Sequence, residues 1–155
     1  MQNGADGIFL AIKAACADQM SPQEYARFGL PYDHPVLDAA SAGWLNLIHL
    51  CGDQIYFEVL DDLPSPFVSY EALSPHNPSL GEGRDRAQRA VIGGVSPKPQ
   101  IGQMSPEQVV AEVTTALEDT GGIQMMIGPG CSISPDTPEA NLRAARRALE
   151  EWASG

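Results

Sequence analysis

The 155-residue sequence has little basic charge and few cysteines, and each shortage excludes a class of protein. Nine lysines and arginines stand against 20 aspartates and glutamates, so a net charge of -11 would repel nucleic-acid backbones and anionic membranes. Three widely spaced cysteines are unlike the dense, even-numbered disulfide framework of a small secreted domain, and they favour a reducing compartment. The sequence has no apolar run of the ~18 residues that a transmembrane helix needs, and residues 1–7 lack a signal-peptide pattern. We therefore expect a cytoplasmic protein with no nucleic-acid or membrane partner.

Short apolar runs bounded by turn residues alternate along the chain with stretches of helical spacing. The length and the 43% hydrophobic content fit one globular domain over residues 1–155. Strands connected through helices are parallel and joined by right-handed crossovers, which makes the fold class α/β. Two architectures fit: part of a (β/α)8 TIM barrel with about five βα units, or an open five-stranded parallel sheet. The predicted strands are residues 7–12, 45–51, 66–70, 90–95 and 124–128.

Three helix starts share one chemistry, a hydroxyl residue followed by proline. Ser21, Ser105 and Thr137 are each predicted to cap a helix, and the first two also have Glu or Gln in the capping-box position. Further helices are expected over residues 32–44 and 53–61, with a short one at 84–88. The last helix is expected to bury an apolar stripe of Leu142, Ala145, Leu149 and Trp152.

The chemistry is expected at the carboxyl ends of two strands. His49 and Cys51 lie two residues apart on a predicted strand, so the alternation directs both side chains to one face. Gly52 ends that strand, and Cys131 follows the last predicted strand in the same way. One imidazole and two thiolates suit tetrahedral Zn²⁺ with a fourth position open to water or substrate. Buried structural thiols and a histidine bound to a loop carbonyl would leave the same pattern, and the spacing does not choose between these readings.

Several segments together resemble the carboxyl-terminal part of the uroporphyrinogen decarboxylase superfamily. The matching segments are GADGI at 4–8, FGLPY at 28–32, HLCG at 49–52, IGGV at 92–95, and GPGCSISPDTP at 128–138 followed by Asn141 and Leu142. The resemblance covers nearly the whole sequence. It implies a (β/α)8 barrel of which five βα units are present and the first three are missing.

That superfamily contains porphyrin decarboxylases, which are lyases, and methylcobamide:thiol methyltransferases. In the methyltransferase branch an H-x-C motif and a distant cysteine hold zinc, and His49, Cys51 and Cys131 match them. The resemblance therefore implies zinc-dependent methyl transfer from a methylated corrinoid to a thiol, with a small-molecule thiol or a corrinoid protein as partner. The decarboxylase branch has His where Cys131 stands, and Ser where this sequence has Ala11 and Ile12. Uroporphyrinogen decarboxylation and a non-catalytic assembly subunit are the alternatives.

Other residues at predicted strand ends are candidates for the same site. Glu71 follows the strand at 66–70 and is a candidate fourth zinc ligand. Tyr70 is a candidate pocket residue. Gly93 and Gly94 would let a cofactor approach the backbone at the end of the fourth strand.

Five βα units cannot close a barrel, so the chain is expected to associate with another chain. Two strand edges and inward residues such as Phe9 would stay uncovered, and each large side chain left exposed forfeits roughly 1.5–3 kcal/mol. We therefore expect a homo-oligomer that buries the edge at residues 7–12 or 124–128, or a separate chain that supplies the missing units. The interface should exceed about 1,000 Å².

Overall fold

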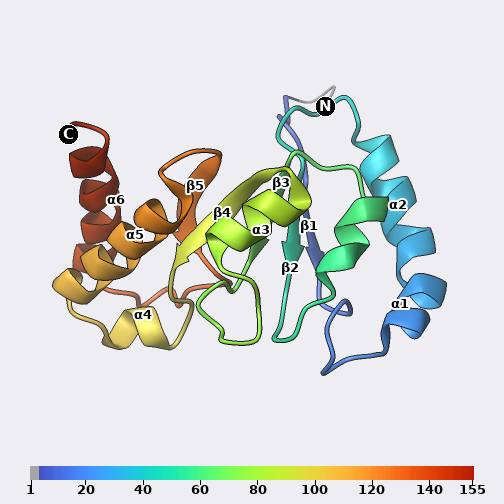
Figure 1. Cartoon of the computed structure of the whole chain (residues 1–155), viewed down its shortest axis with the longest axis horizontal. Helices are drawn as coiled ribbons and strands as arrows, with labels where there is room; N and C mark the ends of the chain where they lie inside the picture. Colours follow the sequence, from blue (N-terminus) through green and yellow to red (C-terminus); the bar gives the residue numbers. More distant parts are fainter. Residues whose placement is uncertain (1–3) are drawn as a thin grey trace.

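The computed structural model describes residues 4–155. Five parallel strands form one sheet in which each strand pairs with the next one along the chain (Figure 1). This unreversed order confirms the α/β prediction and fits part of a (β/α)8 barrel, whereas a doubly wound sheet reverses its strand order. The strands are β1 (Phe9–Ile12), β2 (Leu47–Leu50), β3 (Phe67–Tyr70), β4 (Ala90–Val95) and β5 (Met125–Pro129).

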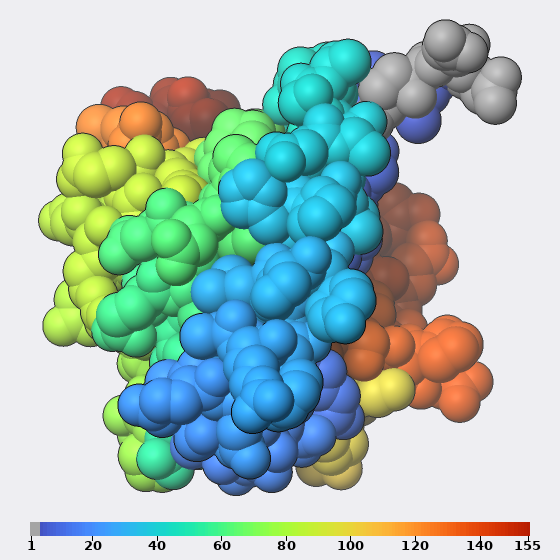
Figure 2. All heavy atoms as spheres, turned by 90° about the vertical axis from the view of Figure 1, so that its right-hand side faces the viewer, coloured from blue at the N-terminus to red at the C-terminus, as the bar shows by residue number. Residues whose placement is uncertain are grey.

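Helices flank the sheet from α1 and α2 at one end to α5 and α6 at the other (Figure 1). Viewed from the first end, the blue and cyan segments around α1 and α2 lie in the foreground, beside green and yellow segments (Figure 2). The helices are α1 (Pro22–Phe28), α2 (Leu30–Ala39), η1 (Phe57–Asp62, a 3-10 helix), α3 (Leu80–Ala87), α4 (Gln100–Gln103), α5 (Pro106–Thr120) and α6 (Glu139–Trp152).

Three of the helices begin with a complete capping box. Ser21 and Ser105 cap α1 and α5 as predicted. Ser79 caps α3 with Glu82 as its partner, so the short helix expected at 84–88 begins earlier than predicted. The predicted cap at Thr137 is wrong, because α6 begins after Pro138 and the Thr137 hydroxyl is buried without a hydrogen-bond partner.

Two other helices differ from their predicted ranges. The helix expected over residues 32–44 is α2, which ends at Ala39. The chain can turn there because the buried Asn46 amide donates to the carbonyl oxygens of Ala40 and Gly43, which satisfies polar groups of the turn. The helix expected over 53–61 is the shorter 3-10 helix η1.

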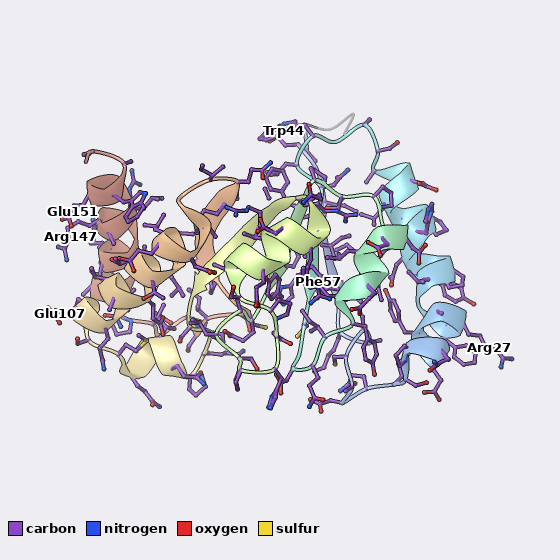
Figure 3. The ribbon with its side chains drawn as sticks, viewed as in Figure 1. Arg27, Trp44, Phe57, Glu107, Arg147 and Glu151 are labelled. Atoms are coloured by element: carbon purple, nitrogen blue, oxygen red, sulfur yellow. The ribbon has the colours of Figure 1, made fainter. Side chains whose placement is uncertain are left out.

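The core lies between the sheet and its helices. Its larger part includes Phe57 of η1, whose ring packs edge-on against Tyr70 at 5.4 Å between ring centroids, and Figure 3 labels Phe57 in the interior. A second part joins β4 and β5 to α5 and α6.

Helix α6 is rotated relative to the sequence prediction. It buries Asn141, Ala144 and Ala148, while the predicted stripe members Leu142, Leu149 and Trp152 stay exposed. The cause is Asn141, whose buried amide donates to the carbonyl oxygens of Ile101 and Met104 and so turns its own face inward. Arg147 and Glu151 project from the outer side of this helix (Figure 3).

The sheet does not close on itself within residues 4–155, so β1 and β5 each keep one unpaired edge. Phe9 on β1 is 61% exposed and Met126 on β5 is 43% exposed. An apolar inner surface is therefore open between the two edge strands. No helix in the described part of the chain is long and apolar enough to cross a membrane.

Candidate metal centre

The structure brings His49, Cys51 and Cys131 together. One ligand atom of each lies within 4.8 Å of the others. His49 is on β2, Cys51 directly follows β2, and Cys131 follows β5. In a flat sheet three strand spacings would separate β2 from β5 by about 14 Å, so the inward curvature of the sheet creates this meeting point.

The two thiols have the separation that a shared metal ion requires. Cys51 Sγ and Cys131 Sγ lie 3.9 Å apart, and both cysteines are free. Tetrahedral zinc with Zn–S bonds of about 2.3 Å sets two sulfurs roughly 3.8 Å apart. A disulfide would need about 2.05 Å. The donor set and its spacing therefore fit zinc.

His49 is held in the form that binds metals. Its side chain is buried, and its Nδ1 lies 2.7 Å from Ser69 Oγ. Burial lowers the pKa of His49, and a backbone hydrogen-bond contribution from Ser69 opposes this only in part. The imidazole is consequently neutral near pH 7, as a metal ligand must be.

The thiol of Cys51 is protonated in the absence of a cation. Burial raises its pKa, the adjacent Cys131 raises it further, and the positive charge of Lys13 acts in the opposite direction. A divalent cation between the sulfurs would reverse this balance, because it favours the thiolate directly. Ionisation of the Cys51 thiol and binding of a metal would therefore go together.

The three candidate ligands line one hollow of about 500 Å³. Its wall is largely apolar, and Lys13 is the one lysine or arginine among the described residues that line it. Lys13 follows β1, two residues after Ala11, which pairs in register with His49. The remaining lining residues are Phe9, Ala11, Leu47, Ser69, Ile92, Pro129 and Ser132.

Glu71 lies beside this centre but outside the group of three. Its carboxyl packs against Gly130, the neighbour of Cys131, where a Cβ atom would come within 2.7 Å of it. One oxygen, Oε1, accepts a hydrogen bond from the Leu73 backbone at 3.1 Å, while Oε2 is buried with no partner. Burial raises the pKa of Glu71.

The other predicted cofactor-binding residues face the helices instead of the hollow. The buried Tyr70 hydroxyl donates to the Ser79 carbonyl oxygen at 2.7 Å. A Cβ on Gly93 would meet Leu80 of α3, and one on Gly94, at φ +95°, would meet Ala116 of α5. Their assignment as cofactor-binding residues stays a prediction, and the contacts seen here are those of close packing of helices on the sheet.

Sequence reasoning missed Ser69 and Lys13, both of which line the hollow. The period-2 alternation could have found them, since each lies two residues from an inward-facing position already considered. Ser69 precedes Glu71 by two residues, and Lys13 follows Ala11 by two.

Two of the known proteins that this chain resembles are named methylcobamide:CoM methyltransferases. The chain is 30% identical to methylcobamide:CoM methyltransferase MtaA of Methanosarcina barkeri, over 98% of this chain and 43% of that protein. It is 26% identical to methylcobamide:CoM methyltransferase MtbA of Methanosarcina acetivorans, over 92% of this chain and 41% of that protein. A uroporphyrinogen decarboxylase of a Synechococcus strain is 26% identical over 81% of the chain and 36% of that enzyme.

Among solved structures, a methyltransferase from Methanosarcina mazei superimposes with a TM-score of 0.82 and 26% sequence identity. The match covers 98% of this chain and 44% of that one, so the chain spans less than half the length of these relatives. The family model described as uroporphyrinogen decarboxylase (URO-D) matches residues 1–152. The chain therefore belongs to the uroporphyrinogen decarboxylase family.

Proposed function

We propose that this chain carries the zinc-binding part of an enzyme that transfers a methyl group from a methylated corrinoid to a thiol. The observation that carries the proposal is the meeting of His49, Cys51 and Cys131 at one end of the sheet. The similarity to two methylcobamide:CoM methyltransferases supports the same chemistry.

A zinc ion held by these residues would bind the sulfur of the acceptor thiol and lower its pKa, so that the thiolate is available at neutral pH. The thiolate sulfur donates an electron pair to the methyl carbon, and a carbon–sulfur bond forms. The carbon–cobalt bond breaks, and both of its electrons stay on the corrinoid cobalt. The proton of the thiol leaves to solvent.

The residues around the centre suit this reaction. Neutral His49 and the two cysteines provide three ligands and leave a fourth position for the thiol. Once the open inner surface is covered, the apolar wall of the hollow would keep water from the nucleophile. The ammonium of Lys13 offsets negative charge on the sulfur atoms, an effect that is stronger in an apolar site than in water.

We further propose that the chain forms five of the eight βα units of a barrel, and that other polypeptide covers the edges of β1 and β5. Two observations support this view. The inner surface between these strands is open, and the chain matches 43% of the length of the Methanosarcina barkeri MtaA protein. A second copy of the chain or a chain with the remaining units could provide the cover.

Uroporphyrinogen decarboxylation is the second candidate, because one relative carries that name. Against it stands Cys131, at the position where the resemblance to the decarboxylase branch implies histidine. A metal-binding group would have no evident use in a decarboxylase that works through positioned side chains.

The test is elemental analysis of the purified chain together with its turnover of methylcobalamin and a thiol. We expect about one zinc per chain, lost in Cys131→Ser but kept in Cys16→Ala, a matched control because Cys16 is buried but does not belong to the group of three. A metal-free chain that decarboxylates a porphyrinogen would replace this proposal with the second candidate. A chain that shows no bound metal and no turnover would be a non-catalytic assembly subunit.

A further inference from the structure

The imidazole of His49 is fixed by contacts from both neighbouring strands. In the parallel register Ala11 of β1 lies beside His49, and Ser69 of β3 lies on its other side. From β3, Ser69 Oγ lies 2.7 Å from Nδ1. From β1, the Phe9 ring stacks on the imidazole with 5.7 Å between centroids and an angle of 25°. A flip of the ring about its Cβ–Cγ bond would break the contact with Ser69.

The contact between Ser69 and His49 is shielded from water. His49 is 6% exposed and Ser69 is 4% exposed. Within residues 4–155, Ser69 Oγ makes no other hydrogen bond. A hydrogen bond in such a low-dielectric place is stronger than one in water, and a buried N–H left without an acceptor is costly.

We propose that Ser69 is a positioning residue that selects the metal-binding tautomer of His49. A neutral imidazole carries its proton on one nitrogen only. When Ser69 Oγ accepts the proton of Nδ1, the free lone pair is on Nε2, which is then the nitrogen available to a metal. The inference rests on the proposed metal function and adds to it the residue that orients the histidine.

A serine suits this role because its hydroxyl can either accept or donate. Before metal binds, the Ser69 hydroxyl can donate to Nδ1, so that its own proton has an acceptor. Once Nε2 holds a metal, Nδ1 must carry the proton and Ser69 must accept it. Replacement by alanine would leave Nδ1–H buried without an acceptor when zinc is bound. The substitution would therefore destabilise the zinc-bound form more than the metal-free form.

The first experiment measures zinc affinity by competition with a chelator. Loss of such an orienting partner typically weakens metal binding 10–100-fold, and we expect that loss in Ser69→Ala. Ser69→Thr keeps the hydroxyl and should restore most of the affinity. Ser65→Ala is the matched control, because Ser65 is also buried but its hydroxyl donates to the carbonyl oxygens of Asn46 and Phe67. Its affinity should equal that of the wild type.

The second experiment shows whether Ser69 acts through His49. In the background of His49→Ala, the further change Ser69→Ala should leave zinc affinity unchanged, because the partner ring is absent. The ¹⁵N shifts of the His49 ring in the zinc-loaded wild type should show a protonated Nδ1 and a metal-bound Nε2. Wild-type affinity in Ser69→Ala, or a metal-bound Nδ1, would overturn the inference. A wild-type chain that binds no zinc would overturn the proposed function as well.

Discussion

Cys51 Sγ and Cys131 Sγ lie 3.9 Å apart, although the two residues are 80 positions apart in the sequence and two further strands separate β2 from β5. Within residues 4–155, no hydrogen-bonded strand pairing joins β2 directly to β5. The proximity of the two sulfur atoms therefore depends on the curvature of the sheet. A metal ion between the two sulfurs would join the ends of β2 and β5 directly and hold that curvature.

Zinc should stabilise the chain. A ligand that binds only the folded state raises the free energy of unfolding by about 2.7 kcal/mol when its free concentration is 100 times its Kd. We expect zinc to raise the unfolding temperature of the wild-type chain and a chelator to lower it. Differential scanning calorimetry at fixed pH, with and without zinc, measures the change.

The cysteine variants provide the control for that measurement. Cys131→Ser should lose most of the zinc-dependent shift, and Cys16→Ala should keep it even if its own stability is lower, because only Cys131 belongs to the group of three. An equal shift in Cys131→Ser and in the wild type would mean that zinc binds elsewhere.

Glu71 should make the metal-free chain less stable as the pH rises. Burial raises its pKa in the folded state, so the folded chain binds this proton more tightly than the unfolded chain does. Its contribution to stability is complete below the unfolded-state pKa and is lost as the pH rises through the folded-state pKa. Glu71→Gln removes the ionisation, so we expect the variant to gain free energy of unfolding near pH 7 and to lose this gain in acid.

Urea unfolding of the metal-free chain from pH 4 to pH 7 measures the effect. Glu107 is a control of opposite sign, because hydrogen bonds at the start of α5 lower its pKa, with Ser105 as the first cause. Figure 3 labels Glu107 at this exposed helix start. Glu107→Gln should therefore gain no stability near pH 7. A pH-independent difference between Glu71→Gln and the wild type would show that ionisation of Glu71 does not matter.

The three residues of the candidate centre could be predicted because two simple rules apply to them. Alternation along a strand puts His49 and Cys51 on one face, and parallel strands bring their carboxyl ends to one side of a sheet. Cys131 needs a third condition, the curvature of the sheet, which no local pattern reveals. The resemblance to a barrel family provided that condition.

The orientation of α6 and the start of α3 could not be predicted, because each depends on contacts made by distant residues. Asn141 looks like an exposed helix residue in the sequence, yet it binds two carbonyl groups near α4. Gly81 and Gly83 weaken the helical pattern of α3. The structure uses both for close packing, since the Gly81 N–H donates to Asp119 and a Cβ on Gly83 would strike the Tyr70 hydroxyl.

The capping box of α3 should contribute measurably to stability. Ser79 accepts from the Glu82 backbone, and the Glu82 carboxylate accepts in return from the Ser79 backbone. Replacement of a serine cap by alanine typically costs about 1 kcal/mol. We expect Ser79→Ala to lower the free energy of unfolding by about that amount. Ser41→Ala, at an exposed turn position, should change it little, and equal values for the two variants in urea unfolding would contradict this account.

The open inner surface should make the chain associate with itself or with a complementary chain. Phe9 and Met126 lie on the two edge strands, exposed by 61% and 43%. A second hollow of about 500 Å³ lies between β5 and α6, with an apolar wall that includes Leu142 and Leu149. The net charge of -11 opposes contact between two copies, so the attraction must be apolar and should persist at high salt, where repulsion is screened. We expect a homodimer or a larger assembly at micromolar concentration.

Sedimentation velocity at low and high salt measures this association. Met126→Glu places a charge on the open edge and should shift the assembly toward the monomer, because burial of an unpaired carboxylate is costly. Tyr32→Glu is the matched control, since Tyr32 is 71% exposed on α2, at the other end of the molecule (Figure 1). This variant should associate like the wild type. A compact wild-type monomer that binds no hydrophobic dye would show that the inner surface needs no cover, because the two edge strands would then be stable in water as they are.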